Sequence, residues 1–417
     1  MMRDAACHEL PSPDVAWMRV RSRWAPPRVP DERVALLDAL GRVTAQPVCS
    51  PLDSPPFDRA AMDGYAVRAG DLTPELSRPS LSVVGEVPMG RAAMQRVEAG
   101  EAIWVATGSM IPPGADAVVN VERTHTAPAR VCIQGPVHPA DHIVRRASAF
   151  CAGAPVLGAG HRLRPQDVAV LASLGLPEVT VVRQPRVAIL VTGDELRLPE
   201  ERLEPGQIYT SNGYALAAQV RLAGGVVALW PLIPDDLHAI TAALDEALAQ
   251  AELVLISGGS SVGTKDLTIQ ALEATTGAAV LVHGVAARPG RPTIVATVGD
   301  RLVIGIPGNP MAAMIAFLMF GHPALELLVR LCPQAAAGTH GGRRLVARLA
   351  EDLPSQPGRQ EYICVRLEAS AEGGVRAVPV RGSSSSLSSM LCSDGLVVVP
   401  PQADQFGMGK EVEVTVF

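Results

Sequence analysis

Polar residues and glycines follow four predicted strands in the second half of the chain. They occupy residues 192–195, 233–236, 257–266 and 306–310. Ligands of parallel α/β sheets bind outside the carboxyl ends of the strands, so we expect these four segments to share one site. Carboxylates there can hold a divalent cation through oxygen, and glycine-rich loops offer backbone N–H groups to an anion. The sequence therefore predicts a site for a phosphorylated ligand at this edge.

The glycine-rich segment 257–266 matches a Walker A phosphate-binding loop only in part. Four residues separate Gly258 from Gly263, but Thr264-Lys265 reverses the Lys-Ser/Thr order that a Walker A loop requires. What remains is a glycine-rich loop that leads into a helix, whose free N–H groups can bind a phosphate. A tight turn that needs glycine for backbone reasons is the alternative interpretation.

The other candidates have ordinary structural explanations as well. Asn309 before a proline is typical of any helix start, and Asp235 with Asp236 is typical of a first helical turn, where acids are favoured. In the N-terminal half, Asp63 precedes a glycine and so indicates a turn, and Thr107 follows a predicted strand with the same ambiguity. The nine histidines include no pair with metal-ligand spacing on a credible helix, so we interpret all of them as structural or surface residues.

Composition excludes several classes of protein. Thirty-six basic and forty-two acidic residues give a net charge of −6, and aromatic residues make up 3%, which argues against a nucleic-acid binder. The longest apolar run, residues 311–320, is too short for a bilayer span of about 20 residues and predicts a buried helix. The N-terminus lacks the apolar core of a signal peptide, and the seven cysteines include no CxxC pair. We therefore expect a cytoplasmic protein.

The hydrophobic pattern predicts a multidomain α/β plus β fold. Residues 31–43 have apolar positions at helical spacing and predict an amphipathic helix. Strands that alternate with helices are typical of a parallel, three-layer α/β domain, and the β-rich end of the chain indicates a small barrel or sandwich. We expect an N-terminal helical and mixed domain (14–50 and 141–184), a small β module (51–140), a central α/β domain (185–335) and a C-terminal β-barrel (338–417).

Six motifs in order along the chain resemble the molybdopterin molybdenumtransferase family, whose fold also appears in the E domain of gephyrin. The resemblance covers nearly the whole chain from about residue 31, and AMDGYAV together with TGDE is highly specific. The motifs are AMDGYAV (61–67), ATGSMIPPGADAVV (106–119), VTGDEL (191–196), SGGSSVG…D (257–266), RPGRP (288–292) and PGNP (307–310).

The resemblance implies a molybdopterin-binding central domain in an elongated homodimer, with the active site between two subunits. It implies Mg²⁺-dependent insertion of molybdenum from molybdate into adenylylated molybdopterin, with release of AMP, and the molybdopterin adenylyltransferase as a partner. Carried over by motif, the catalytic positions are Asp63, Thr107, Glu195 and Asp266, the metal ligands are Glu195, Asp235 and Asp266, and the substrate-binding positions are Asp235, Ser257, Gly258, Gly259, Ser260, Gly263, Arg288, Arg291, Pro307, Gly308, Asn309 and Ser384.

The chain departs from the family pattern at several charged positions. Segment 145–150 reads Arg-Arg-Ala-Ser-Ala-Phe, without the Glu-Asp pair that follows the two arginines in the family. Gly284 and Cys364 stand where the family has basic residues, and Arg288 and Arg291 replace lysines. Arginine keeps the charge and improves bidentate phosphate contact, but it cannot donate a proton.

Two functions from different classes therefore remain open. One is an active molybdenumtransferase, which the carboxylates at 63, 195, 235 and 266 favour. The other is a molybdopterin-binding carrier or scaffold that lacks the insertion activity. A related pyrophosphate hydrolase sharing the α/β domain would lack AMDGYAV.

Overall fold

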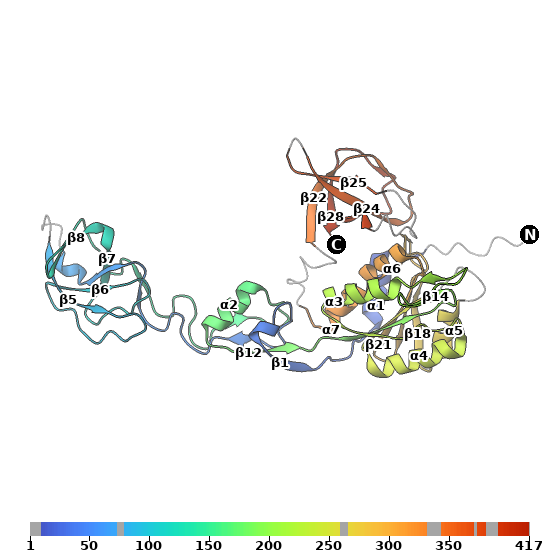
Figure 1. Ribbon diagram of the computed structural model, residues 1–417, viewed down its shortest axis with the longest axis horizontal. Helices are drawn as coiled ribbons and strands as arrows, with labels where there is room; N and C mark the ends of the chain where they lie inside the picture. Colours follow the sequence, from blue (N-terminus) through green and yellow to red (C-terminus); the bar gives the residue numbers. More distant parts are fainter. Residues whose placement is uncertain are drawn as a thin grey trace, which may run out of the picture.

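The computed structural model shows an elongated chain of four bodies. It describes residues 10–72, 79–258, 266–331, 343–370, 373–380 and 391–416. In Figure 1 a β module forms one end, a small mixed domain follows, and the α/β domain lies at the other end beside the barrel. The predicted site residues Gly259, Ser260, Gly263 and Ser384 lie outside the described residues.

The α/β domain is built on a six-stranded sheet with the strand order β16-β13-β17-β21-β20-β18. The first four strands in this order are parallel. Strand β20 runs antiparallel to β21, and β18 runs antiparallel to β20, so β18 again has the direction of the first four. The predicted parallel sheet is therefore correct in direction for five strands and wrong for β20. Only residues 299 and 300 join β20 to β21, and so short a turn permits only an antiparallel hairpin. The strands are β13 (Arg186–Val191), β16 (Val226–Leu229), β17 (Leu253–Ser257), β18 (Ala278–His283), β20 (Ile294–Val298) and β21 (Arg301–Ile306).

Helices cover both faces of this sheet, as the three-layer prediction requires. Residues of α1, α3, α6, η4 and α7 share one buried apolar cluster with the sheet, and residues of α4 and α5 share the other. Helix α1, which the hydrophobic pattern did not reveal, packs here through Ala16, Val20 and Trp24, although the expected N-terminal domain began at residue 14. The helices are α1 (Pro13–Arg23), α3 (Asn212–Leu222), α4 (Leu237–Gln250), α5 (Leu267–Ala274), α6 (Pro310–Ala316), the π-helical segment η4 (Phe317–Gly321) and α7 (His322–Leu328).

One helical stretch is unusually apolar. Among the described residues, Pro310–Leu328 is long and apolar enough to span a membrane, with a mean hydropathy of 1.6. Inside the protein, however, 72% of its apolar window is buried, and Phe317 and Phe320 belong to the core of the α/β domain. The core helix of a soluble protein passes the same test of length and composition. The prediction of a buried helix at residues 311–320 is confirmed.

The mixed domain contradicts one prediction. The expected helix at residues 31–43 is instead β1 (Asp31–Ala35) followed by a short 3₁₀ turn, η1 (Leu36–Asp38). Strand β1 pairs with β12 (Glu178–Val182), and this distant partner supplies the backbone hydrogen bonds that local periodicity cannot anticipate. The domain also contains β2 (Val48–Cys49), β11 (Pro155–Leu157) and the predicted helix α2 (Pro165–Ser173).

The predicted β module contains a six-stranded sheet, and two adjacent linkers connect it to the mixed domain. The linkers pair with each other through β3 (Arg59–Ala60) and β10 (Ile143–Val144). The sheet consists of β4 (Gly64–Val67), β5 (Ser80–Val87), β6 (Glu101–Val105), β7 (Ala117–Asn120), β8 (Thr124–Ala127) and β9 (Arg130–Ile133), with the 3₁₀ turns η2 (Ala69–Asp71) and η3 (Val121–Arg123).

The C-terminal domain is a closed five-stranded barrel, which confirms the predicted fold class. Its strands pair in the order β24-β25-β22-β28-β26, and β26 pairs back with β24. The short strand β19 (Ala287–Arg288) of the α/β domain pairs with β24 and attaches the barrel to that domain. The barrel consists of β22 (Arg343–Leu349), β24 (Gln360–Ala369), β25 (Val375–Pro379), β26 (Gly395–Val399) and β28 (Glu411–Val416), with β23 (Leu353–Pro354) pairing with β27 (Gln405–Phe406) beside it.

Candidate active site

The loops after β13, β17 and β21 meet at the carboxyl edge of the sheet. The Thr192 N–H donates a hydrogen bond to the Ser257 carbonyl at 2.9 Å. The buried side chain of Asn212, at the start of α3, donates from Nδ2 to Ser257 Oγ (2.9 Å) and to the Gly308 carbonyl (2.8 Å). One amide therefore joins the strand ends that carry the predicted residues Ser257 and Gly308.

Gly258 is required by the backbone at this edge. Its φ is +109°, and a Cβ at this position would lie 2.2 Å from the Thr192 carbonyl oxygen. Any side chain would force the two loops apart, so the tight-turn interpretation is correct for this residue.

Two predicted carboxylates lie on adjoining loops. Glu195 is exposed in the turn between β13 and the short strand β14 (Leu196–Arg197), which pairs with β15 (Ile208–Tyr209). The neighbouring Asp194 accepts a hydrogen bond from the Asp235 N–H at 3.1 Å through Oδ1. Asp236 is the N-cap of α4 and accepts from the Ala239 N–H, so it has a structural role at the helix start, although it precedes the first turn in which the sequence placed it. Asp235 stays exposed.

Asp266 has a clear structural role. Its carboxylate caps α5 by accepting a hydrogen bond from the Ile269 N–H at 3.2 Å. Burial raises the pKa of the Asp266 carboxyl above its ordinary value, because a low-dielectric surrounding disfavours the ionised form. A cation or a cationic ligand nearby would reverse this effect.

The described residues contain no cluster of three Asp, Glu, His or Cys side chains that could hold a metal ion by themselves. Mg²⁺ in phosphoryl-transfer sites is usually held by one or two carboxylates together with substrate phosphates. The exposed Glu195 and Asp235 on adjoining loops fit this mode of binding. Two of the three predicted magnesium ligands, Glu195 and Asp235, therefore fit a site that the substrate completes, and the third, Asp266, caps α5.

The segment RPGRP places Arg288 next to the barrel. Arg288 lies in β19 and forms an ion pair with Glu361 of the barrel strand β24 at 3.6 Å. The side chain of Arg291 is exposed, and its carbonyl accepts a hydrogen bond from the Val285 N–H. The Arg288 guanidinium therefore lies at the junction of two domains, and the Arg291 side chain is open to solvent.

The other half of the predicted site is a hydrogen-bonded pair in the β module. Asp63 Oδ1 accepts from the Thr107 N–H (2.7 Å) and from Thr107 Oγ1 (2.8 Å). These bonds, the backbone one first, hold the pKa of the Asp63 carboxyl below its ordinary value. The β module lies at the opposite end of the molecule from the α/β domain (Figure 1), so one chain keeps this pair apart from the strand ends.

Comparison with known proteins gives the family. Models of the MoeA N-terminal region (domains I and II), a probable molybdopterin-binding domain and the MoeA C-terminal region (domain IV) match residues 12–175, 188–327 and 346–417. Molybdopterin molybdenumtransferases from Nostoc sp. and Bacillus subtilis are 36% and 33% identical. Their alignments each cover 92% of this chain, and 88% and 89% of those proteins. The chain belongs to the molybdopterin molybdenumtransferase family.

A solved structure agrees with this assignment over the full length. The molybdopterin biosynthesis MoeA protein from Pyrococcus horikoshii superimposes with a TM-score of 0.83 at 32% identity, covering 98% of this chain and 100% of that one. The resemblance that the six motifs indicated is confirmed, and so is the multidomain fold class. The individual roles of the predicted site residues stay predictions.

The linker segment that departs from the family carries two ion pairs. Arg145 pairs with Asp58 and Arg146 with Asp53, each at 2.6 Å. Hydrogen bonds from the Arg146 and Ala152 N–H groups, together with the arginines, lower the pKa of both aspartates. The Glu-Asp pair is missing after Arg145 and Arg146, and these two arginines are bound to Asp58 and Asp53 of the other linker.

The two other departures remove positive charge. Gly284 has a φ of +84° and packs against Leu10, so it supplies no cation in place of the family's basic residue. The Cys364 thiol lies 3.6 Å from Met311 Sδ, and burial raises its pKa, which keeps it neutral. Neither position takes over the role of the basic residue.

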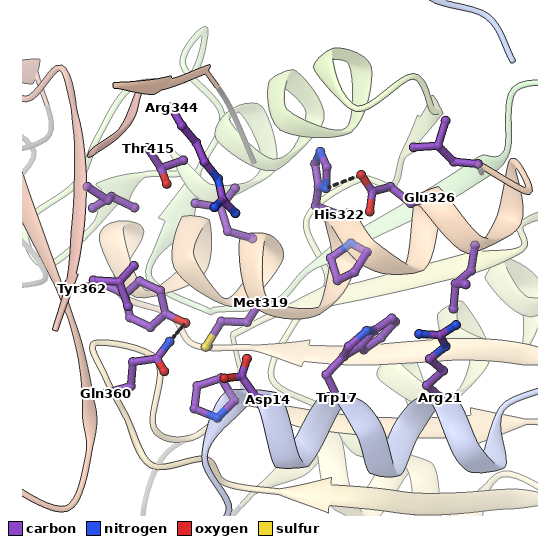
Figure 2. Close-up of a pocket in the computed structure, with 17 residues that line it drawn as sticks. Asp14, Trp17, Arg21, Met319, His322, Glu326, Arg344, Gln360, Tyr362 and Thr415 are labelled. Atoms are coloured by element: carbon purple, nitrogen blue, oxygen red, sulfur yellow. Dashed lines mark hydrogen bonds and ion pairs between the residues drawn. The ribbon is translucent and has the colours of Figure 1, made fainter. Parts of the chain in front are cut away.

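A cavity of about 580 Å³ lies at the boundary between the α/β domain and the barrel. It opens between α1, α7 and the barrel, and Figure 2 shows Trp17, Tyr362, Gln360 and Arg344 pointing into it. Three elements far apart in the chain build it, so sequence patterns could not indicate it. None of the predicted site residues that the structure describes lines this cavity.

Two residues of the site were missed by sequence reasoning. Asn212 follows Ser211 at a helix start, and that pattern is the usual signal of a helix cap, which hides its contacts with two strand ends. Glu361 lies in a β-rich run of the last domain, and only the pairing of β19 with β24 brings it to Arg288. The acid within the GRQEY segment is the signal that could have marked it.

Proposed function

We propose that the protein inserts molybdenum from molybdate into adenylylated molybdopterin and releases AMP. Membership of the molybdenumtransferase family supports a transferase role in molybdenum cofactor biosynthesis. The observation that carries the proposal is the junction that Asn212 makes between the Ser257 and Gly308 loops, next to the carboxylates of the β13 and β16 loops. This edge combines anion-binding backbone with oxygen ligands for a cation.

Two buried polar atoms support a ligand at this edge. Within the described part of the chain, Thr192 Oγ1 and Asn212 Oδ1 are buried and have no hydrogen-bond partner. Buried polar atoms in proteins are nearly always paired, so an unpaired one calls for a bound group or a water. Molybdopterin offers amino and amide N–H donors that suit these two acceptors.

The carboxylates and the arginines have different proposed roles at the substrate. Glu195 and Asp235 would hold Mg²⁺ together with the pyrophosphate of the substrate, and this ion would neutralise the charge on the departing AMP. Arg288 and Arg291 would bind the oxyanions through their planar N–H groups. Asp266, at the end of the glycine-rich segment, would offer a further oxygen ligand to this ion from the α5 side.

A homodimer completes the site in this proposal. Asp63 and Thr107 lie at the far end of the chain from the strand edge, so a second copy would bring its β module to this edge. We expect light scattering to give twice the chain mass of 43.6 kDa. A monomer at micromolar concentration would contradict this arrangement.

One assay separates the transferase from the carrier. Purified protein is incubated with adenylylated molybdopterin, molybdate and Mg²⁺, and the release of AMP and the formation of active cofactor are measured. We expect both. Tight binding of molybdopterin without AMP release would instead support the carrier, which the missing Glu-Asp pair after Arg146 favours. The cytoplasmic location and the adenylyltransferase partner belong to the same proposal.

A further inference from the structure

Arg288 and Glu361 are neighbours across the boundary between two domains. Strand β19 pairs in parallel with β24, and the register sets Arg288 opposite Glu361. The second contact is electrostatic, because Arg288 Nη1 lies 3.6 Å from Glu361 Oε1. The barrel therefore contacts the RPGRP segment through both backbone and charge.

The two side chains differ strongly in exposure. The Glu361 side chain is 9% exposed, whereas that of Arg288 is 59% exposed. Among the residues that the structure describes, Arg288 is the cation paired with this buried carboxylate. Burying a carboxylate is costly unless it is paired. The buried Glu361 side chain therefore fixes the position of this ion pair, and the exposed Arg288 side chain is the partner that is held. The outer N–H groups of the guanidinium remain open to solvent.

The alternation of β24 fixes the direction of Glu361. Gln360 and Tyr362, on either side of it, point into the cavity of Figure 2, where the Gln360 amide donates to the Tyr362 hydroxyl at 2.8 Å. Successive side chains of a strand point to opposite faces, so Glu361 shares its face with Ile363 and Val365 of the barrel core. Its carboxylate cannot swing into the cavity without breaking this packing.

We propose that Glu361 is a positioning residue that holds the Arg288 guanidinium ready for an oxyanion of the substrate. The inference rests on the proposed function, in which Arg288 binds the molybdate oxyanion. A free arginine loses much rotamer freedom when it binds an anion, whereas an anchored one has already lost it. The barrel thus contributes to anion binding through a residue that does not touch the anion.

This role also explains why arginine suits position 288. A guanidinium has five N–H donors in a planar fork, so one edge can face Glu361 while another faces an oxyanion. A lysine ammonium is a compact point charge and orients an anion less well between two acceptors. The Lys-to-Arg departure from the family fits a site in which one cation serves two acidic partners.

Two effects of removing the Glu361 charge oppose each other. Replacing it with glutamine removes a negative charge beside Arg288, and electrostatics alone would then strengthen anion binding. Loss of the anchor frees the Arg288 side chain and weakens anion binding. The sign of the change in affinity therefore distinguishes a positioning residue from a competing counter-ion.

The test uses the full-length protein with the substitutions Glu361→Gln and Glu361→Asp. Molybdate affinity is measured by calorimetry, and KM and kcat are measured by AMP release. Glu361→Gln should weaken molybdate binding about 3- to 10-fold and raise KM for molybdate equally, with KM for adenylylated molybdopterin unchanged. Glu361→Asp keeps the charge and should lose less.

A matched control lies on the same strand. Glu368 pairs with Arg366 at the exposed surface of β24, and Glu368→Gln removes one charge without touching Arg288. It should leave molybdate affinity unchanged. Thermal unfolding of all variants confirms that the barrel is folded.

The outcomes separate this inference from the proposed function. Unchanged or tighter molybdate binding by Glu361→Gln, with AMP release intact, would refute the positioning role alone. Weaker molybdate binding by Glu361→Gln, in a protein that never releases AMP, would refute the transferase alone and support the positioning role. A wild-type protein that binds no molybdate would overturn both.

Discussion

Two inactive variants should restore each other's activity when they are mixed, if each active site draws residues from two chains. Asp63→Ala removes the carboxylate that accepts both hydrogen bonds of Thr107 in the β module. Glu195→Ala removes an exposed carboxylate at the strand edge of the α/β domain. Each variant alone should be nearly inactive. Removing the exposed Glu195 side chain should change stability by no more than about 0.5 kcal/mol.

The expected recovery follows from the symmetry of the dimer. Random exchange of subunits makes about half of the dimers mixed, and a two-fold dimer contains two equivalent sites. In a mixed dimer, one site receives both substitutions and the other receives none. The mixture should therefore reach about a quarter of the wild-type rate, because half of the dimers have one of two sites intact.

The assay is AMP release after the two variants are unfolded and refolded together. A mixture of Glu195→Ala with Asp266→Ala is the matched control, because both residues belong to the α/β domain and every site then lacks one of them. That mixture should stay inactive. If the Asp63 and Glu195 variants also stay inactive after native mass spectrometry has shown mixed dimers, the shared site is wrong.

Three further predictions concern single carboxylates. Asp266→Ala should lose activity and about 1 kcal/mol of stability through the lost α5 cap, whereas Asp266→Asn should keep the cap and lose activity, as unfolding and AMP-release assays will show. Asp235→Ala should raise the Mg²⁺ concentration for half-maximal rate, and an unchanged titration would exclude it as a ligand. Bonds to Arg164 and His161 lower the pKa of the Asp167 carboxyl despite its burial, so its stabilisation is present above pH 4 and lost in acid. The difference in unfolding temperature between wild type and Asp167→Asn should therefore shrink from pH 7 to pH 3.

The sequence was most informative where local pattern and burial agree. Strands such as β13 and β17 are buried on both faces, so their continuous apolar runs marked them, and the residues that follow them marked the edge of the site. Prediction from the sequence failed where the local structure depends on pairing with a segment that is distant in the chain. Residues 31–35 pair with β12, and this leaves Leu37 92% exposed, a position that the predicted helix would have packed.

The candidate site was also predictable only in part. The residue types at the strand ends were predictable, because ligand-binding loops of α/β sheets always lie at that edge. The contacts that organise these loops were not predictable from the sequence. Asn212 bridges the Ser257 and Gly308 loops, and Glu361 reaches Arg288 from another domain, so each role exists only after folding.

The departures from the family pattern share one physical feature. Compared with that pattern, the chain lacks two acids after Arg146 and two cations at Gly284 and Cys364, so charges of both signs are missing together. Three of the arginines that remain are held by acids, since Arg145 and Arg146 pair with the opposite linker and Arg288 pairs with the barrel. A fixed guanidinium binds an anion with less loss of freedom than a mobile one. Fewer charges, each held in place, can therefore form a working site.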